Sequence, residues 1–288
     1  MVVIQQLIEQ SIGGIMARRG SELANADLDM AFANDEFALV FQPKVDLATG
    51  KICGAEALCR WYHHSLGDLP PGVFISYMIR QGRLVELTRF TLTRGIEAAA
   101  AWHAEGHHFP VHINLSADDL NHGGLTQFLE MRLRHHGLSP QAVRIELSEA
   151  EVNNMPREAR NNLRELLSTG VSLALQGPAE KAYHDSDEIP VAEFQLRGTA
   201  LLGLAAALAE GQSGRVLGMI RAAKRLGRET TAIALETPLH VEMARDLGFD
   251  SATGYAFARP MPLEDLIYWA DTRRPDAAPD ANEAIALP

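Results

Sequence analysis

Residues 37–61 read "FALVFQPKVDLATGKICGAEALCRW", two apolar runs on either side of the polar turn "DLATGK". The second run carries Glu56 and Arg60, four residues apart, among apolar neighbours. A carboxylate inside an apolar run is costly to bury unless it is paired or bound to a metal. The stretch predicts two strands and raises the question of whether Glu56 belongs to a working site or to the remnant of one.

Apolar runs of the same kind return along the rest of the chain. Six more follow, at residues 111–115, 143–147, 171–175, 193–196, 230–235 and 252–257. Longer amphipathic stretches, such as 84–104 and 212–226, lie between them and are typical of helices. Alternating strands and helices predict a parallel α/β sheet, and eight strands fit a closed TIM-type (β/α)8 barrel in one domain.

The two ends of the chain differ from this pattern. The predicted barrel covers residues 28–271, and residues 1–27 are predicted to form an N-terminal helical extension. Isoleucines recur in that extension at helical spacing, namely Ile4, Ile8, Ile12 and Ile15. This helix either covers one end of the barrel or contacts a partner or a second subunit. Residues 272–288 contain three prolines and no periodicity, which predicts a disordered tail.

Composition narrows the class of partner. The 288-residue chain is 47% hydrophobic and 22% charged, as ordinary soluble globular proteins are. Its 26 Lys and Arg against 37 Asp and Glu give a net charge of −11, which argues against binding to DNA or RNA polymers but does not exclude a small nucleotide. We find neither a membrane span nor a secretory signal in the sequence, and therefore expect a cytoplasmic location with Cys53 and Cys59 reduced.

Polar residues stand where the predicted strands end, which is where barrels of this type place their chemistry. They are Gln42, Glu56, Arg60, Asn114, Glu146 and Glu236. Taken singly, each acid is better explained as a buried group held by a neighbouring arginine, such as Arg60 or Arg144, or by backbone donors. Together, Glu56, Asn114 and Glu146 are oxygen donors of the kind that Mg²⁺ or Mn²⁺ prefers.

Several motifs, in the same order, resemble the EAL domain family of cyclic di-GMP phosphodiesterases. They are the stretch 37–61 quoted above, "PPGVFI" (70–75), "HINLS" (112–116), "RIELSE" (144–149), "ETPLHVEMARDLGFD" (236–250) and "GYAFARPMP" (254–262). The resemblance covers about residues 28–270 and implies a barrel of the EAL kind. In an active member it implies phosphodiester hydrolysis by two divalent ions.

The resemblance also assigns roles to individual positions. The family's metal ligands fall on Glu56, Asn114 and Glu146. Its contacts to the dinucleotide fall on Gln42, Leu58 and Arg60, and Glu149 matches a glutamate that steadies the loop after the next strand.

Five positions depart from the family pattern. Gln176 and Gly177 replace two aspartates, Gln195 replaces a lysine near the attacking water, Ile233 replaces the first of two glutamates, of which Glu236 is the second, and Thr253 replaces a glutamine. These losses imply that Mg²⁺ or Mn²⁺ binds weakly or not at all. We therefore predict no cofactor, no metal site and no phosphodiesterase activity.

The leading hypothesis is a catalytically inactive EAL-type domain that serves as a regulatory protein–protein interaction module in bacterial signalling. Its partner would be another protein or a second copy of the chain, and the candidate surfaces are the N-terminal helix and the rewritten loop 176–190. The alternative is a receptor that binds cyclic di-GMP without cleaving it, although Arg60 is the one evident cation among several acids. Its family-matched contacts would be Gln42, Glu56, Leu58, Arg60, Asn114, Glu146 and Glu236.

Two weaker hypotheses concern bound metal ions. A residual phosphodiesterase with a single weak metal is a third hypothesis. His103 and His107 have the spacing of helical metal ligands, but Gly106 is expected to end the helix between them, so no metal site is predicted there.

Overall fold

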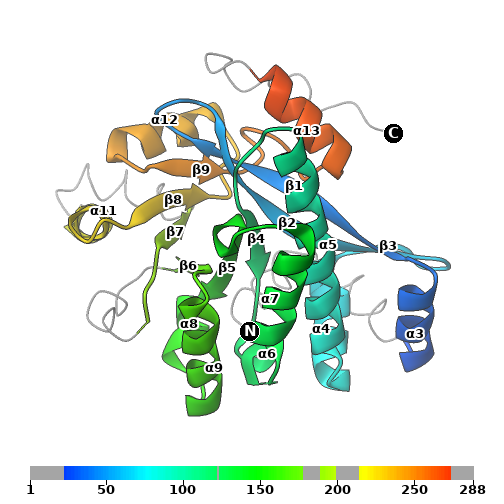
Figure 1. Cartoon of the computed structure of the whole chain (residues 1–288). Helices are drawn as coiled ribbons and strands as arrows, with labels where there is room; N and C mark the ends of the chain where they lie inside the picture. The colour runs from blue at the N-terminus through cyan, green and yellow to red at the C-terminus, as the bar shows by residue number, and fades with distance from the viewer. Residues whose placement is uncertain (1–22, 122, 178–188, 199–213, 274–288) are drawn as a thin grey trace.

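The computed structural model describes residues 23–121, 123–177, 189–198 and 214–273. Within these ranges eight strands close a barrel in the order β1-β9-β8-β7-β6-β5-β4-β2, and β2 pairs back to β1. The strands are β1 (Phe37–Asp46), β2 (Ile52–His63), β4 (Val111–Asn114), β5 (Val143–Ser148), β6 (Ser172–Gln176), β7 (Glu193–Arg197), β8 (Glu229–Ile233) and β9 (Ser251–Thr253). This closed barrel with surrounding helices confirms the predicted TIM-type α/β fold (Figure 1).

Strand β1 corrects the prediction of a parallel sheet, because it runs antiparallel to both of its neighbours, β2 and β9. The connection between β1 and β2 is too short for the crossover that parallel neighbours need. Asp46 closes this turn, since its side chain accepts hydrogen bonds from the backbone nitrogen and the hydroxyl of Thr49, both at 2.7 Å. The short strand β3 (Gly67–Leu69) then extends the sheet from the far end of β2.

Helices cover the outside of the barrel because the outward-facing strand residues are apolar. Ile113, Ile145 and Leu173 stand side by side in register on β4, β5 and β6, and all three are fully buried in the main hydrophobic core. The helices are α3 (Asn25–Ala33), α4 (Pro71–Gln81), α5 (Leu84–Ala104), α6 (Ala117–Asn121), α7 (Leu125–His136), η1 (Pro140–Ala142), α8 (Glu149–Asn153), α9 (Arg157–Ser168), α11 (Gly214–Arg225), α12 (Pro238–Leu247) and α13 (Leu263–Thr272).

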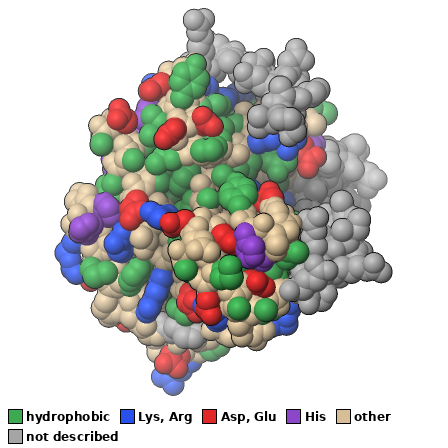
Figure 2. Space-filling view, turned by 90° about the vertical axis from the view of Figure 1, so that its right-hand side faces the viewer, with side chains coloured by type: hydrophobic (Ala, Val, Ile, Leu, Met, Phe, Trp, Pro, Cys, Tyr) green, Lys and Arg blue, Asp and Glu red, His purple; other side chains and the backbone are tan. Residues whose placement is uncertain are grey.

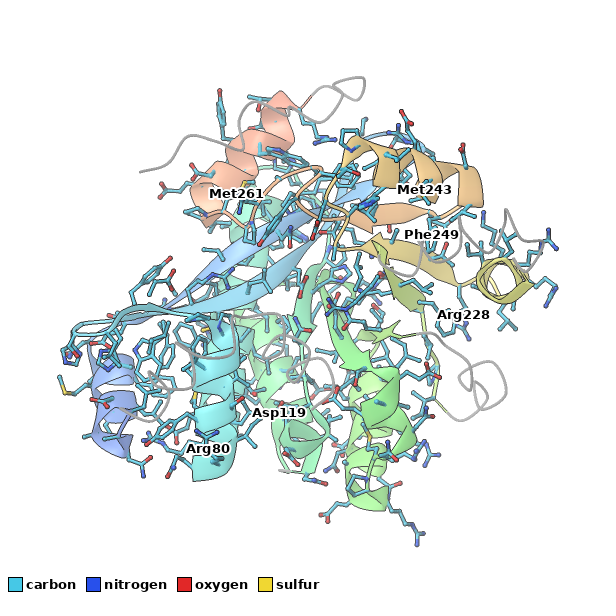
Figure 3. The ribbon with its side chains drawn as sticks, turned by 180° about the vertical axis from the view of Figure 1, so that it is seen from behind. Arg80, Asp119, Arg228, Met243, Phe249 and Met261 are labelled. Carbon is cyan, nitrogen blue, oxygen red and sulfur yellow. The ribbon has the colours of Figure 1, made fainter. Side chains whose placement is uncertain are left out.

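A second hydrophobic cluster lies outside the barrel, between α3, α4 and the β2–β3 hairpin. Phe37, Trp61 and Phe74 form its aromatic centre, with ring centroids 5.0 to 5.9 Å apart. The hairpin reaches beyond the barrel above α3, as Figures 1 and 3 show. Helix α3 straddles the predicted boundary at residue 28 and belongs to this cluster through Leu28 and Ala31.

Several local predictions can be compared with the structure. Helix α5 has the predicted bounds 84–104, and Gly106, with a φ of +91°, follows its end before His107. The predicted strand 252–257 is wrong beyond residue 253, where the chain turns; Met261, labelled in Figure 3, then bridges to Phe41 on β1. The predicted disordered tail after residue 273 and most of the predicted N-terminal extension lie outside the described residues.

Two further predictions concern the cysteines and membrane spans. Cys53 and Cys59 are both free, and burial raises the pKa of each thiol to about 12, so neither is a reactive thiolate at neutral pH. Among the described helices, none is long and apolar enough to cross a bilayer.

Candidate functional site

The interior of the barrel is polar and charged. Several hydrogen bonds join strands that are not neighbours in the sheet, so the side chains that make them must meet across the interior. Lys44 on β1 donates to Glu193 on β7, and Gln195 on β7 donates to Glu146 on β5. On β5 and β7 the alternation therefore sends apolar residues outward to the helices and polar residues inward.

Two carboxylates, from β2 and β5, form the centre of the candidate site. Asn114, at the end of β4, donates from Nδ2 to Oε1 of Glu56 at 2.7 Å. Burial, together with the nearby charge of Glu146, raises the pKa of Glu56 to about 7. The structure thus brings together Glu56, Asn114 and Glu146, the three residues that the sequence placed at neighbouring strand ends.

Glu146 is held by two donors on the same oxygen. Nε2 of Gln195 lies 2.6 Å from Oε1 of Glu146, and Nδ1 of His112 lies 2.7 Å from that atom. Burial and the charge of Glu193 raise the pKa of Glu146 to about 7. Burial and the charge of Lys44 lower the pKa of His112 to about 3, so the imidazole is neutral at pH 7 and donates from Nδ1.

Glu193 lies beneath this pair and is fully buried. It accepts hydrogen bonds from Lys44, from Arg144 at 2.5 Å, from Thr231 at 2.6 Å and from Gln195 at 3.1 Å. Burial alone would raise the pKa of Glu193, but the positive charges of Lys44 and Arg144 hold it well below its usual range. The barrel interior therefore contains a permanently ionised, fully hydrogen-bonded acid.

The cations of the site differ from those expected. Arg60 is the one evident cation of the site in the sequence, but its guanidinium donates to the carbonyl oxygen of Cys59 at 2.9 Å. Arg197, at the end of β7, carries a positive charge close enough to Glu56 to oppose the rise in its pKa. Arg144 does not hold Glu146, as the sequence had suggested, but pairs with Glu193 and Glu229.

The substituted positions are integrated into the barrel. The backbone nitrogen of Gly177 donates to the carbonyl oxygen of Gln195 at 3.0 Å, and Gly177 has a φ of +151°. A Cβ atom at this glycine would lie 2.9 Å from Cβ of Glu149. Thr253 donates from its hydroxyl to the carbonyl oxygen of Pro43 at 3.0 Å, and Ile233 is buried.

The side chains of the remaining predicted residues take no part in the hydrogen bonds that hold the carboxylates of Glu56 and Glu146. Gln42 donates to the carbonyl oxygen of Ala258 at 3.1 Å, Leu58 is half-buried, and Glu236 is exposed in the loop after β8. Gln176 ends β6 and is half-buried, while residues 178–188 of the proposed partner loop lie outside the described residues.

Sequence reasoning missed Lys44, His112 and Glu193. His112 stands two residues before Asn114, and Glu193 stands two residues before Gln195, so each shares a strand face with a residue that had been singled out. Side chains two residues apart on a strand share a face, and this alternation could have identified both residues from the sequence.

The comparisons with known proteins agree on one family. Over residues 25–260 the chain matches the family model described as EAL domain. The uncharacterized protein Rv1357c of Mycobacterium tuberculosis is 33% identical over 250 residues, which are 83% of this chain and 80% of that protein. An uncharacterized signaling protein of Caulobacter vibrioides is 28% identical over 257 residues, which are 87% of this chain and 31% of that protein.

Solved structures share the architecture. The PaMucR phosphodiesterase in complex with c-di-GMP aligns with a TM-score of 0.74 and 26% identity, over 84% of this chain and 98% of that one. The EAL domain of Mycobacterium smegmatis DcpA aligns with a TM-score of 0.65 and 22% identity, over 83% and 99% of the two chains, and is similar in fold alone.

Proposed function

The chain belongs to the EAL domain family, and we propose that it is a catalytically inactive member that binds another protein in bacterial signalling, in the cytoplasm. The observation that carries this proposal is the capture of Glu146 by Gln195 and His112. Gln195 stands where the family resemblance expects the lysine near the attacking water. In this chain, that position donates a hydrogen bond to a carboxylate that would otherwise ligate metal.

The donor set does not fit a pair of divalent ions. Two donors occupy one oxygen of Glu146, and Asn114 turns its amide nitrogen, not its oxygen, toward Glu56. The pKa values of about 7 for both acids mean that protons compete for them at neutral pH. Gln176 and Gly177 add no carboxylate at the end of β6, so this end of the barrel lacks ligands that a metal-dependent step would need.

The space for one lost carboxylate has also closed. A side chain at position 177 would need a backbone conformation that L-residues rarely adopt, and its Cβ atom would meet the side chain of Glu149. The packing around Gly177 therefore leaves no room for an aspartate side chain at this position, which supports the proposed loss of hydrolysis.

Exposed residues on the rim of the barrel support a protein contact. Leu239, 60% exposed, follows β8, and Tyr255, 54% exposed, follows β9, so both lie at the carboxyl ends of the parallel strands. The guanidinium of Arg259 lies 4.6 Å from the centre of the Tyr255 ring. Tyrosine and arginine are enriched among residues that dominate binding energy at protein interfaces.

Hydrolysis is tested first, with purified protein, cyclic di-GMP and Mg²⁺ or Mn²⁺. We expect no turnover above that of Glu56→Gln, and metal-dependent turnover would overturn the assignment of an inactive domain.

The protein contact is tested by placing a photo-crosslinking residue at position 255 in the native host. A control is placed at Tyr268, which is 70% exposed on α13. A discrete adduct formed from position 255 and not from 268 is the expected result. Equal adducts from both positions, or none from 255, would remove the rim as the contact surface.

The second candidate function is a cyclic di-GMP receptor, and Arg197 is the observation that favours it. This arginine brings a positive charge to the site beside Glu56, where sequence reasoning had expected only Arg60. Calorimetric titration with cyclic di-GMP, in Mg²⁺, in Ca²⁺ and in chelator, tests it. Binding that survives chelation and is weakened by Arg197→Ala or Arg60→Ala would support a receptor, whereas no binding under any condition would exclude it.

A further inference from the structure

A cluster of two histidines and a glutamate lies outside the barrel, on the β2–β3 hairpin side. Glu36 precedes β1, His63 ends β2 and His64 begins the following turn, and one potential ligand atom from each lies within 4.8 Å of the others. We propose that Glu36, His63 and His64 form a binding site for a divalent transition-metal ion of the zinc class. This site is independent of the family's site inside the barrel.

An unpartnered nitrogen points to a missing ligand. His63 is 4% exposed, and among the residues that the structure describes its Nε2 has no hydrogen-bond partner. Oδ1 of Asp27 lies 3.8 Å from Nε2 of His63, which is beyond hydrogen-bond distance. A buried polar atom without a partner is costly, and a cation bound to Nε2, once its hydrogen has moved to Nδ1, would remove that cost.

Glu36 is prepared to act as a ligand. Trp61 donates from Nε1 to Oε2 of Glu36 at 2.8 Å, which fixes the carboxylate and leaves Oε1 facing Nδ1 of His64 at 2.9 Å. Burial alone would raise the pKa of Glu36, but the hydrogen bonds from Trp61 and His64 lower it. The carboxylate is therefore ionised at neutral pH, and its second oxygen has the supporting partner that metal ligands commonly have.

The imidazole of His63 requires a change of tautomer. In the arrangement described, the backbone nitrogens of Ser65 and Leu66 donate to Nδ1 of His63 at 3.1 and 3.3 Å, which places the hydrogen on Nε2. The hydroxyl of Ser65 lies 3.3 Å from the same Nδ1. Binding through Nε2 requires the hydrogen on Nδ1, so the turn must move until the backbone nitrogens of Ser65 and Leu66 no longer donate to Nδ1. The hydroxyl of Ser65 can then accept the hydrogen of Nδ1, and Nε2 becomes free to bind metal.

An ion can reach the cluster from solvent, and the three ligands can close around it. The side chain of His64 is 46% exposed, so an ion can enter from solvent. Figure 2, which views this side of the molecule, shows histidine and acidic side chains at the surface. Zinc bonds of about 2.0–2.1 Å bring tetrahedral ligand atoms to roughly 3.4 Å from one another. The cluster must therefore tighten by about an ångström, and the turn that carries His64 can supply that movement.

The ligand chemistry selects the ion. Two imidazoles with one carboxylate suit Zn²⁺, Ni²⁺ or Cu²⁺, whereas Mg²⁺ and Ca²⁺ prefer oxygen ligands alone.

The test is calorimetric titration of the metal-stripped full chain with Zn²⁺ at pH 7.5. We expect one ion per chain and at least tenfold weaker binding in Glu36→Gln and in His64→Ala. Gln at position 36 can still accept from Trp61, and His64 is half exposed, so both variants should keep the fold. Equal unfolding midpoints without metal verify this.

Two matched controls locate the ion. His108→Ala removes an exposed histidine elsewhere, and Glu56→Gln removes an acid of the barrel site, so both should bind Zn²⁺ as the parent does. Co²⁺ should give the absorption of a tetrahedral site with nitrogen and oxygen ligands in the parent and lose it in His64→Ala. No saturable binding, binding unchanged in both cluster variants, or binding lost in Glu56→Gln would overturn the proposal.

Discussion

Glu193 shows how a single residue organises the barrel interior. Its fully buried carboxylate joins β7 to Lys44 on β1 and to Arg144 on β5. Removing its charge leaves the buried Lys44 unpaired and leaves Arg144 with Glu229 alone, and breaking a buried ion pair typically costs about 3–5 kcal/mol. We predict that Glu193→Gln lowers the unfolding free energy by that amount in urea denaturation.

The control for this prediction is Glu229→Gln. Glu229 also pairs with Arg144, but its side chain is 54% exposed, so its loss should cost within about 1 kcal/mol. Equal destabilisation by the two variants would contradict the central role of Glu193.

Glu56 should make folding stability depend on pH. Its pKa rises from 4.5 to about 7 on folding, so the unfolded chain releases this proton first as the pH increases. Stability from this residue is therefore complete below pH 4.5 and lost as the pH rises to about 7. His112 acts in the opposite direction, because its pKa falls to about 3, so the measurement must isolate Glu56.

The difference in unfolding free energy between the parent and Glu56→Gln provides that isolation. We expect the parent's advantage to shrink by roughly 1–3 kcal/mol between pH 4.5 and 7, measured by chemical denaturation. A difference that does not change with pH would mean that Glu56 is ionised throughout.

For individual residues, the sequence predicted which polar side chains stand at the strand ends but not which residues they contact. Glu56, Asn114 and Glu146 could be grouped because neighbouring parallel strands end at one rim. The contact between Lys44 and Glu193 could not be predicted, because it crosses a closed barrel and depends on how the strands are staggered.

The sequence predicted the positions of the strands better than their lengths. The last predicted strand was too long because Gly254, with a φ of +149°, turns the chain immediately after Thr253. A Cβ atom there would lie 2.2 Å from the backbone nitrogen and oxygen of Leu235. The close approach depends on a neighbouring loop and is not visible in the local sequence.

We therefore predict that Gly254→Ala lowers the unfolding free energy by at least about 3 kcal/mol or prevents folding. Gly218 in α11 is the matched control, because its Cβ would meet no atom within 4 Å. Gly218→Ala should raise the helix propensity and stabilise the chain by up to about 1 kcal/mol in thermal or urea unfolding. If both alanines had similar effects, the backbone contact would not be limiting.

The antiparallel placement of β1 illustrates a different limit. Helix-strand alternation predicts parallel neighbours, but the turn after Asp46 enforces a hairpin at the start of the barrel. Sequence patterns count the strands correctly here, whereas the direction of each depends on the length of its connection.

Over the whole molecule, the proposed loss of hydrolysis should not be reversible by restoring residue types alone. The triple variant Gln176→Asp, Gly177→Asp and Gln195→Lys returns three of the four charged residues that the family resemblance expects and leaves Ile233 in place. However, an aspartate at 177 would have to place its Cβ 2.9 Å from that of Glu149, in a backbone conformation unfavourable for any L-residue. The rest of the barrel is packed around a glycine.

We predict that the triple variant shows no Mn²⁺-dependent hydrolysis of cyclic di-GMP above that of the parent. It should also unfold at a lower urea concentration than the double variant Gln176→Asp, Gln195→Lys, which keeps Gly177 and so isolates the steric effect. Turnover by a triple variant as stable as the double would show that the residue types at these three positions, and not the backbone around Gly177, prevent hydrolysis. No turnover together with lower stability would mean that the structure around Glu149 has no room for an aspartate at position 177.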